Sequence, residues 1–173
     1  DYSQIELRLL AHISGDEGMC AAFIGGKDIH RTTASEVFGV PFDEVSSDMR
    51  NAAKAVNFGI VYGISDFGLA RNLDIPVKRA SEYIKLYFER YPRVKAYLDE
   101  SVEAAKRLGY AVTMFDRRRS MTELKSANYN TRSFGERVAM NMPIQGTAAD
   151  IIKLAMVRVH SELKTRGLKA KLI

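Results

Sequence analysis

The sequence has little cysteine, no long apolar run and no repeated segment. Its single cysteine, Cys20, cannot form an internal disulfide, so nothing indicates an oxidising compartment. The longest apolar stretches, residues 56–64 and 151–159, fall well short of the roughly 20 residues that a membrane helix requires. No group of residues has the spacing of a zinc site. These absences exclude disulfide scaffolds, repeat arrays and membrane-spanning proteins, and we expect no membrane partner.

The charge is moderately basic, with 26 Lys and Arg against 21 Asp and Glu, a net charge of +5 and a pI near 9.3. Such an excess is a weak indication of an anionic partner, because a solvated surface explains it equally well. The distribution is more informative. Arg50 and Lys54 lie one helical turn apart, and residues 117–119 are three consecutive arginines.

The hydrophobic pattern predicts an α+β protein that is mostly helical. We expect a capping box at Ser3 and Glu6 to start the first helix. Pro143 and Gly146 should interrupt the last helical region. Predicted helices cover 4–14, 28–38, 47–62, 65–73, 76–90, 93–108, 131–141 and 147–166, with strands at 110–115 and after Gly167. With no leader before Asp1 and a strand beginning at the last residues, we expect truncation at both ends.

Four side chains recur every fourth residue in the predicted helix 47–63: Arg50, Lys54, Phe58 and Tyr62. At 1.5 Å per residue they form a row about 18 Å long, with two cations at one end and two aromatic rings at the other. Cations suit phosphate oxygens, and aromatic faces suit a sugar or base. The row therefore matches a nucleoside triphosphate, although an amphipathic helix with a basic outer face has the same spacing.

Acidic and imidazole groups supply further candidates. Asp1 at a strand end could ligate Mg²⁺, which prefers one or two carboxylates plus substrate phosphates; a lone Asp is more often exposed to solvent. Glu6 is a poor second ligand, because the capping box explains it. His30 could donate to a phosphate, or it could be a partly exposed histidine whose helix is capped by Asp28.

Polar residues around the predicted break at Pro143 could contact a duplex: Arg137, Asn141 and Gln145. The acceptors of the minor groove are degenerate and suit contacts that do not depend on base sequence. Asn141 and Gln145 could equally be turn and cap residues. Residues 117–119 could bind a phosphodiester backbone or form a solvated turn.

Together these stretches resemble the family A DNA polymerases, the bacterial DNA polymerase I type. Residues 1–8 look like the first palm motif of that family. Residues 50–63 match the fingers-helix motif Arg-x3-Lys-x3-Phe-Gly-x2-Tyr-Gly, and residues 141–150 look like the motif before the second catalytic strand. Three long motifs in the order of the family cover essentially the whole chain, which makes the match highly specific.

The resemblance implies catalytic roles for several positions. Asp1 would be a carboxylate ligand of two Mg²⁺ ions, assisted by the backbone carbonyl of Tyr2. Arg50, Lys54 and His30 would hold the triphosphate. Lys54 would also protonate the pyrophosphate leaving group, so Asp1 and Lys54 are the expected catalytic residues.

The remaining matched positions would contact the nucleotide and the DNA. Phe58 would pack against the sugar and base, and Tyr62 would sit where the template base enters. Glu6 would exclude a 2′-hydroxyl through a contact with Tyr62. Contacts with primer or template near the insertion site are implied for Gln4, which also adjoins the incoming nucleotide, and for Arg137, Asn141 and Gln145.

The implied function is template-directed DNA synthesis in replication or repair, with primer-template DNA and deoxynucleoside triphosphates as partners. The implied organisation is a palm segment over 1–30, fingers over 31–109 and a return to the palm over 110–173. The parent would be a monomer in the bacterial cytoplasm, associated with the nucleoid.

Two departures from the family pattern stand out. The second catalytic motif, Val-His-Asp-Glu, is absent from these 173 residues, so we expect the isolated chain to be inactive. Asp116 stands where many relatives have Gly.

Two alternative functions differ in the residues that they require. A single-subunit RNA polymerase would need room for the 2′-hydroxyl, and Glu6 argues against it. A nucleic-acid-binding module without catalysis would have no reason to combine Asp1, Lys54, Phe58 and Tyr62.

Overall fold

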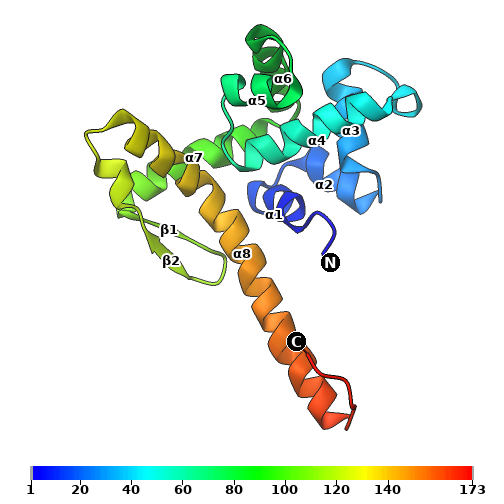
Figure 1. The fold of residues 1–173 in the computed structure, drawn as a ribbon, viewed down its shortest axis with the longest axis vertical. Coiled ribbons are helices and arrows are strands. Elements are labelled where there is room, and N and C mark those ends of the chain that lie inside the picture. The colour runs from blue at the N-terminus through cyan, green and yellow to red at the C-terminus, as the bar shows by residue number, and fades with distance from the viewer. Residues whose placement is uncertain (1, 173) are drawn as a thin grey trace.

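The computed structural model describes residues 2–172 and consists mainly of helices (Figure 1). Among these residues, the β-structure is one short antiparallel hairpin of two strands. The α-helices are α1 (Ile5–Ser14), α2 (Glu17–Ile24), α3 (Ile29–Phe38), α4 (Ser47–Val61), α5 (Asp66–Leu73), α6 (Val77–Arg90), α7 (Pro92–Leu108) and α8 (Tyr129–Thr165). The hairpin strands are β1 (Tyr110–Val112) and β2 (Arg118–Ser120), and 3₁₀ turns cover η1 (Phe42–Glu44) and η2 (Thr122–Lys125). The predicted α+β class, mostly helical, is confirmed.

Local capping explains most helix starts. The Asp28 carboxylate accepts from the backbone N–H groups of His30 and Arg31 at the start of α3, and the Ser46 hydroxyl accepts from Met49 N at the start of α4. Such caps satisfy amide groups that have no partner within the helix. The predicted capping box at Ser3 is wrong, because Gln4 precedes α1 with a left-handed backbone and no side-chain cap. Helix α2 was not predicted.

The predicted break near Pro143 is also wrong. Helix α8 is 37 residues long and passes through Pro143 without a break. A proline inside a helix removes one hydrogen bond and costs about 3 kcal/mol. Packing of the residues before and after Pro143 must therefore stabilise the continuous helix. Ala139 and Ile144 are fully buried, and the Thr147 hydroxyl donates to the Pro143 carbonyl at 2.5 Å. Burial of an apolar face thus outweighs the local preference of proline.

The hairpin differs from the prediction in its strands. The predicted strand 110–115 ends at Val112, and the segment read as a basic turn contributes a second strand. Ala111 pairs with Arg119 in antiparallel register. Asp116 in the connecting turn has φ +60°, a left-handed conformation that Gly adopts most easily. The expected strand after Gly167 is not formed among the described residues.

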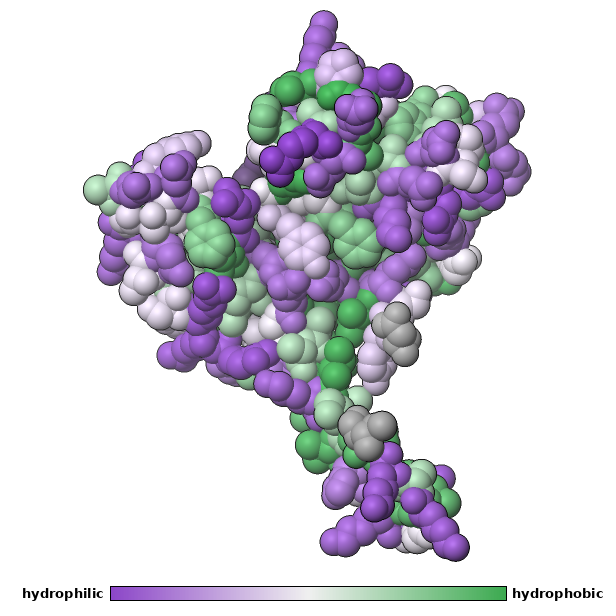
Figure 2. Space-filling model, in the orientation of Figure 1, coloured by the Kyte–Doolittle hydropathy of each residue, from purple (hydrophilic) through white to green (hydrophobic). Residues whose placement is uncertain are grey.

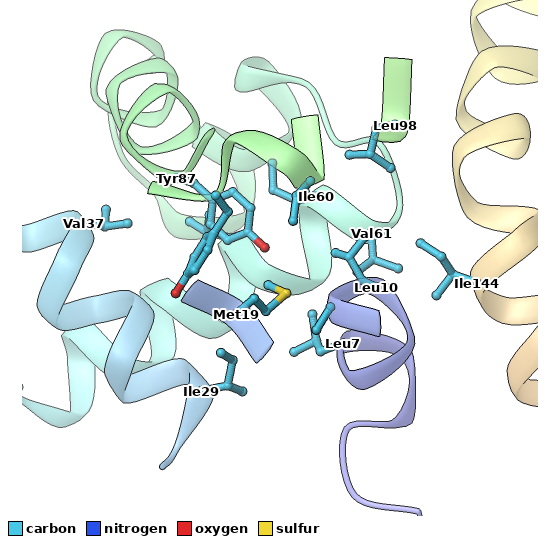
Figure 3. Close-up of a cluster of buried hydrophobic side chains, with 14 of the residues drawn as sticks. Leu7, Leu10, Met19, Ile29, Val37, Ile60, Val61, Tyr87, Leu98 and Ile144 are labelled. Atoms are coloured by element: carbon cyan, nitrogen blue, oxygen red, sulfur yellow. The ribbon is translucent and has the colours of Figure 1, made fainter. Parts of the chain in front are cut away.

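The main core lies where seven helices meet, α1 to α7, and one side of α8 closes it (Figure 3). Leu7 and Leu10 of α1, Val61 of α4 and Ile144 of α8 belong to this core, and all four are essentially buried. Full burial of one such side chain contributes about 1.5–3 kcal/mol. This cluster fixes α1 against α4 and α8, the helices that carry the candidate site.

The second half of α8 projects away from the other helices (Figure 1). Hydrophobic residues lie on the surface of this projection (Figure 2), among them Leu154, Met156, Val157 and Val159, which are all exposed. Among the described residues, no helix is both long enough and apolar enough to cross a membrane.

Candidate functional site

The row predicted on α4 lies on the surface of the helix. Lys54 and Tyr62 are exposed, and Arg50 and Phe58 are partly exposed. The intervening Ala53, Val56, Ile60 and Val61 point into the protein core. The helical repeat thus separates a buried apolar face from an outer face with two cations and two rings. Within the described residues, Lys54 makes no ion pair, so its ammonium group is available to a ligand.

Arg50 is held by the residue that caps α3. Its Nε donates to Asp28 Oδ2 at 2.8 Å, while Asp28 Oδ1 caps the helix. Burial acts to raise the pKa of Asp28, but the hydrogen bonds from Arg50 and the backbone, with the charge of Arg50, outweigh burial and place this pKa below its ordinary value of 3.8. Asp28 therefore remains ionised, and its carboxylate fixes the position of Nε in the Arg50 guanidinium group. Sequence reasoning assigned the cap but missed this ion pair.

His30 is brought beside the α4 row by the start of α3. Its side chain is 3% exposed, and its ring centroid lies 5.7 Å from that of Phe58 at 40°. Burial lowers the pKa of His30, Asp28 acts to raise it, and the charges of Arg50 and Lys54 lower it further. His30 is therefore neutral near pH 7. His30 is not the partly exposed histidine of the alternative, although Asp28 does cap its helix as that alternative supposed.

Tyr62, Glu6 and Gln145 form a cluster where α4 meets α1 and α8. The Tyr62 hydroxyl donates to Glu6 Oε2 at 3.0 Å. Gln145 Nε2 donates to Glu6 Oε1 at 3.3 Å and to the Tyr62 hydroxyl at 3.1 Å. Burial and the neighbouring Glu6 raise the pKa of Tyr62, and Gln145 acts to lower it. The contact expected between Glu6 and Tyr62 is present.

A cleft of about 620 Å³ opens beside Tyr62, between the hairpin and α8. One wall consists of Arg137, Asn141 and Gln145, which follow each other at four-residue intervals on one face of α8. Asn141 Nδ2 donates to the Val61 carbonyl at 3.2 Å. Asn141 and Gln145 are therefore not turn or cap residues, because the helix runs through them.

The three consecutive arginines line the other wall of this cleft. Arg117 donates to Asp150 Oδ1 at 2.8 Å and to the Gly146 carbonyl at 2.7 Å, which ties the hairpin to α8. Arg118 lies over the Tyr110 ring at 4.8 Å. Arg119 lies 3.5 Å from Glu123. Of the three, Arg118 has no carboxylate partner among the described residues, so its charge is the least compensated.

The metal ligands predicted at the amino terminus are only partly described. Asp1 lies outside the described residues. The Tyr2 carbonyl accepts from Ile5 N at 3.3 Å, and Gln4 has φ +55°. No three His, Cys, Asp or Glu side chains of residues 2–172 are grouped as metal ligands would be. Glu6 contacts Tyr62 and Gln145 instead.

One buried polar residue was missed. Asn57 is fully buried on α4 and contacts His30 and Thr33 of α3. A signal was present in the sequence, because Asn57 falls on the apolar face formed by residues 53, 56 and 60. A lone amide on such a face needs buried partners.

Comparison with known proteins identifies the class. The chain matches the DNA polymerase family A over residues 1–173. It belongs to that family.

The chain is 58% identical over its whole length to DNA polymerase I of Caldicellulosiruptor bescii and to DNA polymerase I of Bacillus subtilis. It spans 20% of each of these relatives. Among solved structures it resembles the POL domain of Pol1 from M. smegmatis in complex with DNA primer-template and dNTP, with a TM-score of 0.93 and 46% identity. That likeness covers 98% of this chain and 30% of the other.

Proposed function

We propose that these residues form part of a DNA-directed DNA polymerase, which adds deoxynucleotides to a primer under the direction of a template. The observation that carries the proposal is the α4 row, which ends beside Glu6 and Gln145 at the mouth of a cleft lined by arginines. The relative from M. smegmatis was solved with primer-template and dNTP, and the same ligands suit this surface.

In this proposal Arg50, Lys54 and His30 hold the triphosphate of the incoming nucleotide. Preorganised cations and N–H donors stabilise the charge that develops on phosphate oxygens in the transition state. Arg50 is held ready by Asp28. Lys54, whose ammonium group is free of ion pairs among the described residues, protonates the pyrophosphate as it leaves. Phe58 packs against the sugar and base.

The remaining site residues select the sugar and contact the DNA. Glu6, held by Tyr62, occupies the space that a 2′-hydroxyl would need. Tyr62 lies where the template base enters. Primer and template are contacted from one face of α8, by Arg137, Asn141 and Gln145, and by Gln4. The three arginines of the hairpin face the same cleft, so the DNA backbone would lie along it.

The family implies two Mg²⁺ ions, and these 173 residues supply only part of their ligands. Asp1 and the Tyr2 carbonyl are hard oxygen donors of the type that Mg²⁺ prefers. Residues 2–172 contain no group of three or more side chains that could hold a metal ion, so a second acidic ligand would come from the Val-His-Asp-Glu motif of the family, which these 173 residues do not contain. When bound, the ions supply charge stabilisation and activation of the primer 3′-hydroxyl.

The proposal extends to the domain organisation, the activity of the isolated chain and the cellular role of the whole protein. Residues 1–30 belong to the palm, 31–109 to the fingers and 110–173 to the return toward the palm. The 173 residues alone are inactive, because half of the metal site is missing. The parent is a monomer that acts on nucleoid DNA in the bacterial cytoplasm, in replication or repair.

The test uses a chimera in which this chain replaces the aligned 173 residues of the Bacillus subtilis DNA polymerase I. We expect the chimera to extend a primed template with deoxynucleotides in the presence of Mg²⁺, and the isolated chain not to. A folded chimera that binds DNA but does not extend the primer would contradict the proposal and favour a binding module. Equal use of ribonucleotides would favour the RNA polymerase alternative.

A further inference from the structure

Asn57 has no part in the function proposed above, yet it is fully buried directly behind His30. Its Nδ2 lies 3.1 Å from His30 Nδ1. The same amide is clamped by Thr33, whose Oγ1 donates to Asn57 Oδ1 at 3.2 Å and accepts from Nδ2 at 3.1 Å. The amide is thus held between Thr33 and His30, and its donor end, Nδ2, faces Nδ1 of the imidazole.

The hydrogen bond determines which ring nitrogen carries the proton. An amide N–H that points at Nδ1 requires a lone pair on Nδ1, so the proton of the neutral ring resides on Nε2. No hydrogen bond of the described residues uses Nε2. The imidazole lies beside Phe58 of the α4 row, and Nε2 is the ring nitrogen that Asn57 does not engage.

We propose that Asn57 is a positioning residue, which holds His30 with its proton on Nε2 so that the imidazole donates a hydrogen bond to a phosphate oxygen of the nucleotide. The inference rests on the proposed function. It adds a residue that touches no substrate and acts through His30. The surroundings of the ring support it, because burial and the charges of Arg50 and Lys54 lower the pKa of His30 and together outweigh Asp28, which acts to raise it. A neutral imidazole with its proton fixed on Nε2 can donate a hydrogen bond without carrying a positive charge.

The first test is the pH profile of Asn57→Asp in the chimera. A carboxylate can only accept, so His30 must place a proton on Nδ1, and its pKa rises. Below the raised pKa the ring is doubly protonated and Nε2 still donates. Above it Nε2 loses its proton. We expect kcat/KM for the nucleotide to fall about tenfold as pH rises through that pKa. The unsubstituted chimera, with a donor at every pH, lacks this step.

The second test is a double-mutant cycle. Asn57→Leu should lower kcat/KM about threefold to tenfold, the effect of losing one hydrogen bond. In a His30→Ala chimera the same substitution should have no further effect, because the residue through which Asn57 acts is gone. Asn51→Leu, at an exposed position of α4, is the matched control and should leave kcat/KM unchanged.

Two results would overturn the inference. One is a pH profile of Asn57→Asp that coincides with that of the unsubstituted chimera. The other is an equal loss from Asn57→Leu with and without His30, which is the behaviour of a purely structural residue. Circular dichroism checks that each variant is folded. Failure of the proposed function is recognised separately, because the unsubstituted chimera would then not extend a primer.

Discussion

The hydroxyl of Tyr62, at the end of α4, donates a hydrogen bond of 3.0 Å to Glu6 on α1, a residue 56 positions earlier in the chain. Gln145 of α8 donates to both partners. Three helices therefore meet through side chains at one point of the surface. Any movement of α4 relative to α1 must break or rearrange this cluster.

Glu6→Ala in the chimera should relax discrimination against ribonucleotides. In the proposed site, the substitution removes the side chain that would fill the space of a 2′-hydroxyl, and it removes the acceptor of the Tyr62 hydroxyl. Steric and polar differences of this kind are worth about 10–200-fold in kcat/KM. The ratio of kcat/KM for a ribonucleotide to that for its deoxynucleotide measures the effect. Glu100→Ala, at an exposed position of α7, is the control, and an unchanged ratio in Glu6→Ala would remove the assigned role.

Lys54→Ala should slow incorporation strongly. In the proposed site, the substitution removes a positive charge and the proton donor to the leaving group, and loss of one such electrostatic group costs about 10²–10³ in kcat. Single-turnover extension at saturating nucleotide measures the chemical step. Lys78→Ala removes an exposed charge from α6 and should have no effect. Equal rates for Lys54→Ala and Lys78→Ala would show that Lys54 has no part in catalysis.

Arg117 and Arg118 should differ in what they contribute. Arg117 is paired with Asp150, whose side chain is only 13% exposed and also accepts from the Thr113 hydroxyl at 2.8 Å. Arg117→Ala leaves this carboxylate without its cation. Loss of a partner from a largely buried polar group costs about 1–3 kcal/mol, which urea unfolding of the chain would detect.

Arg118→Ala should leave stability nearly unchanged and weaken DNA binding by the chimera. If Arg118 neutralises one phosphate, the slope of log Kobs against log salt should become shallower by about 0.9. Fluorescence anisotropy of a labelled primer-template over a salt series gives that slope. A slope equal to that of the unsubstituted chimera would show that Arg118 does not contact phosphate.

Acidification should destabilise the chain through His30. Its pKa in the folded protein lies below the ordinary value of 6.5, so the unfolded chain binds more protons between the two values. Stability then rises with pH in that window, is fully present above about pH 6.5 and is lost as pH falls through the folded pKa. The free energy of unfolding in urea at several pH values from 7 to 5 tests this.

His30→Asn is the matched variant for this pH series, because it keeps an acceptor for Asn57 but cannot titrate in that range. It should flatten the pH dependence between pH 7 and 5. If the substituted and unsubstituted chains lose stability in parallel, another group is responsible.

Features that depend on neighbouring residues could be predicted from the sequence alone. Asp28 and Ser46 cap α3 and α4 through hydrogen bonds to backbone N–H groups two or three residues further along the chain. The spacing of Arg50, Lys54, Phe58 and Tyr62 determines that they share a face of any helix, because the helical repeat is a property of the backbone. Membership of the family was likewise evident from the order of three motifs.

Features that depend on packing were decided by the tertiary structure. Helix α8 passes through Pro143 because residues on both sides of it are buried, whereas local preference predicts a break. Strand β2 exists because its arginines pair with β1. The partners of Glu6, Arg50 and Asn57 come from other helices, 22 to 139 positions away. The sequence by itself determined which side chains lie on each helix face, and only the burial of apolar surface decided which faces meet, because that free energy depends on the whole chain.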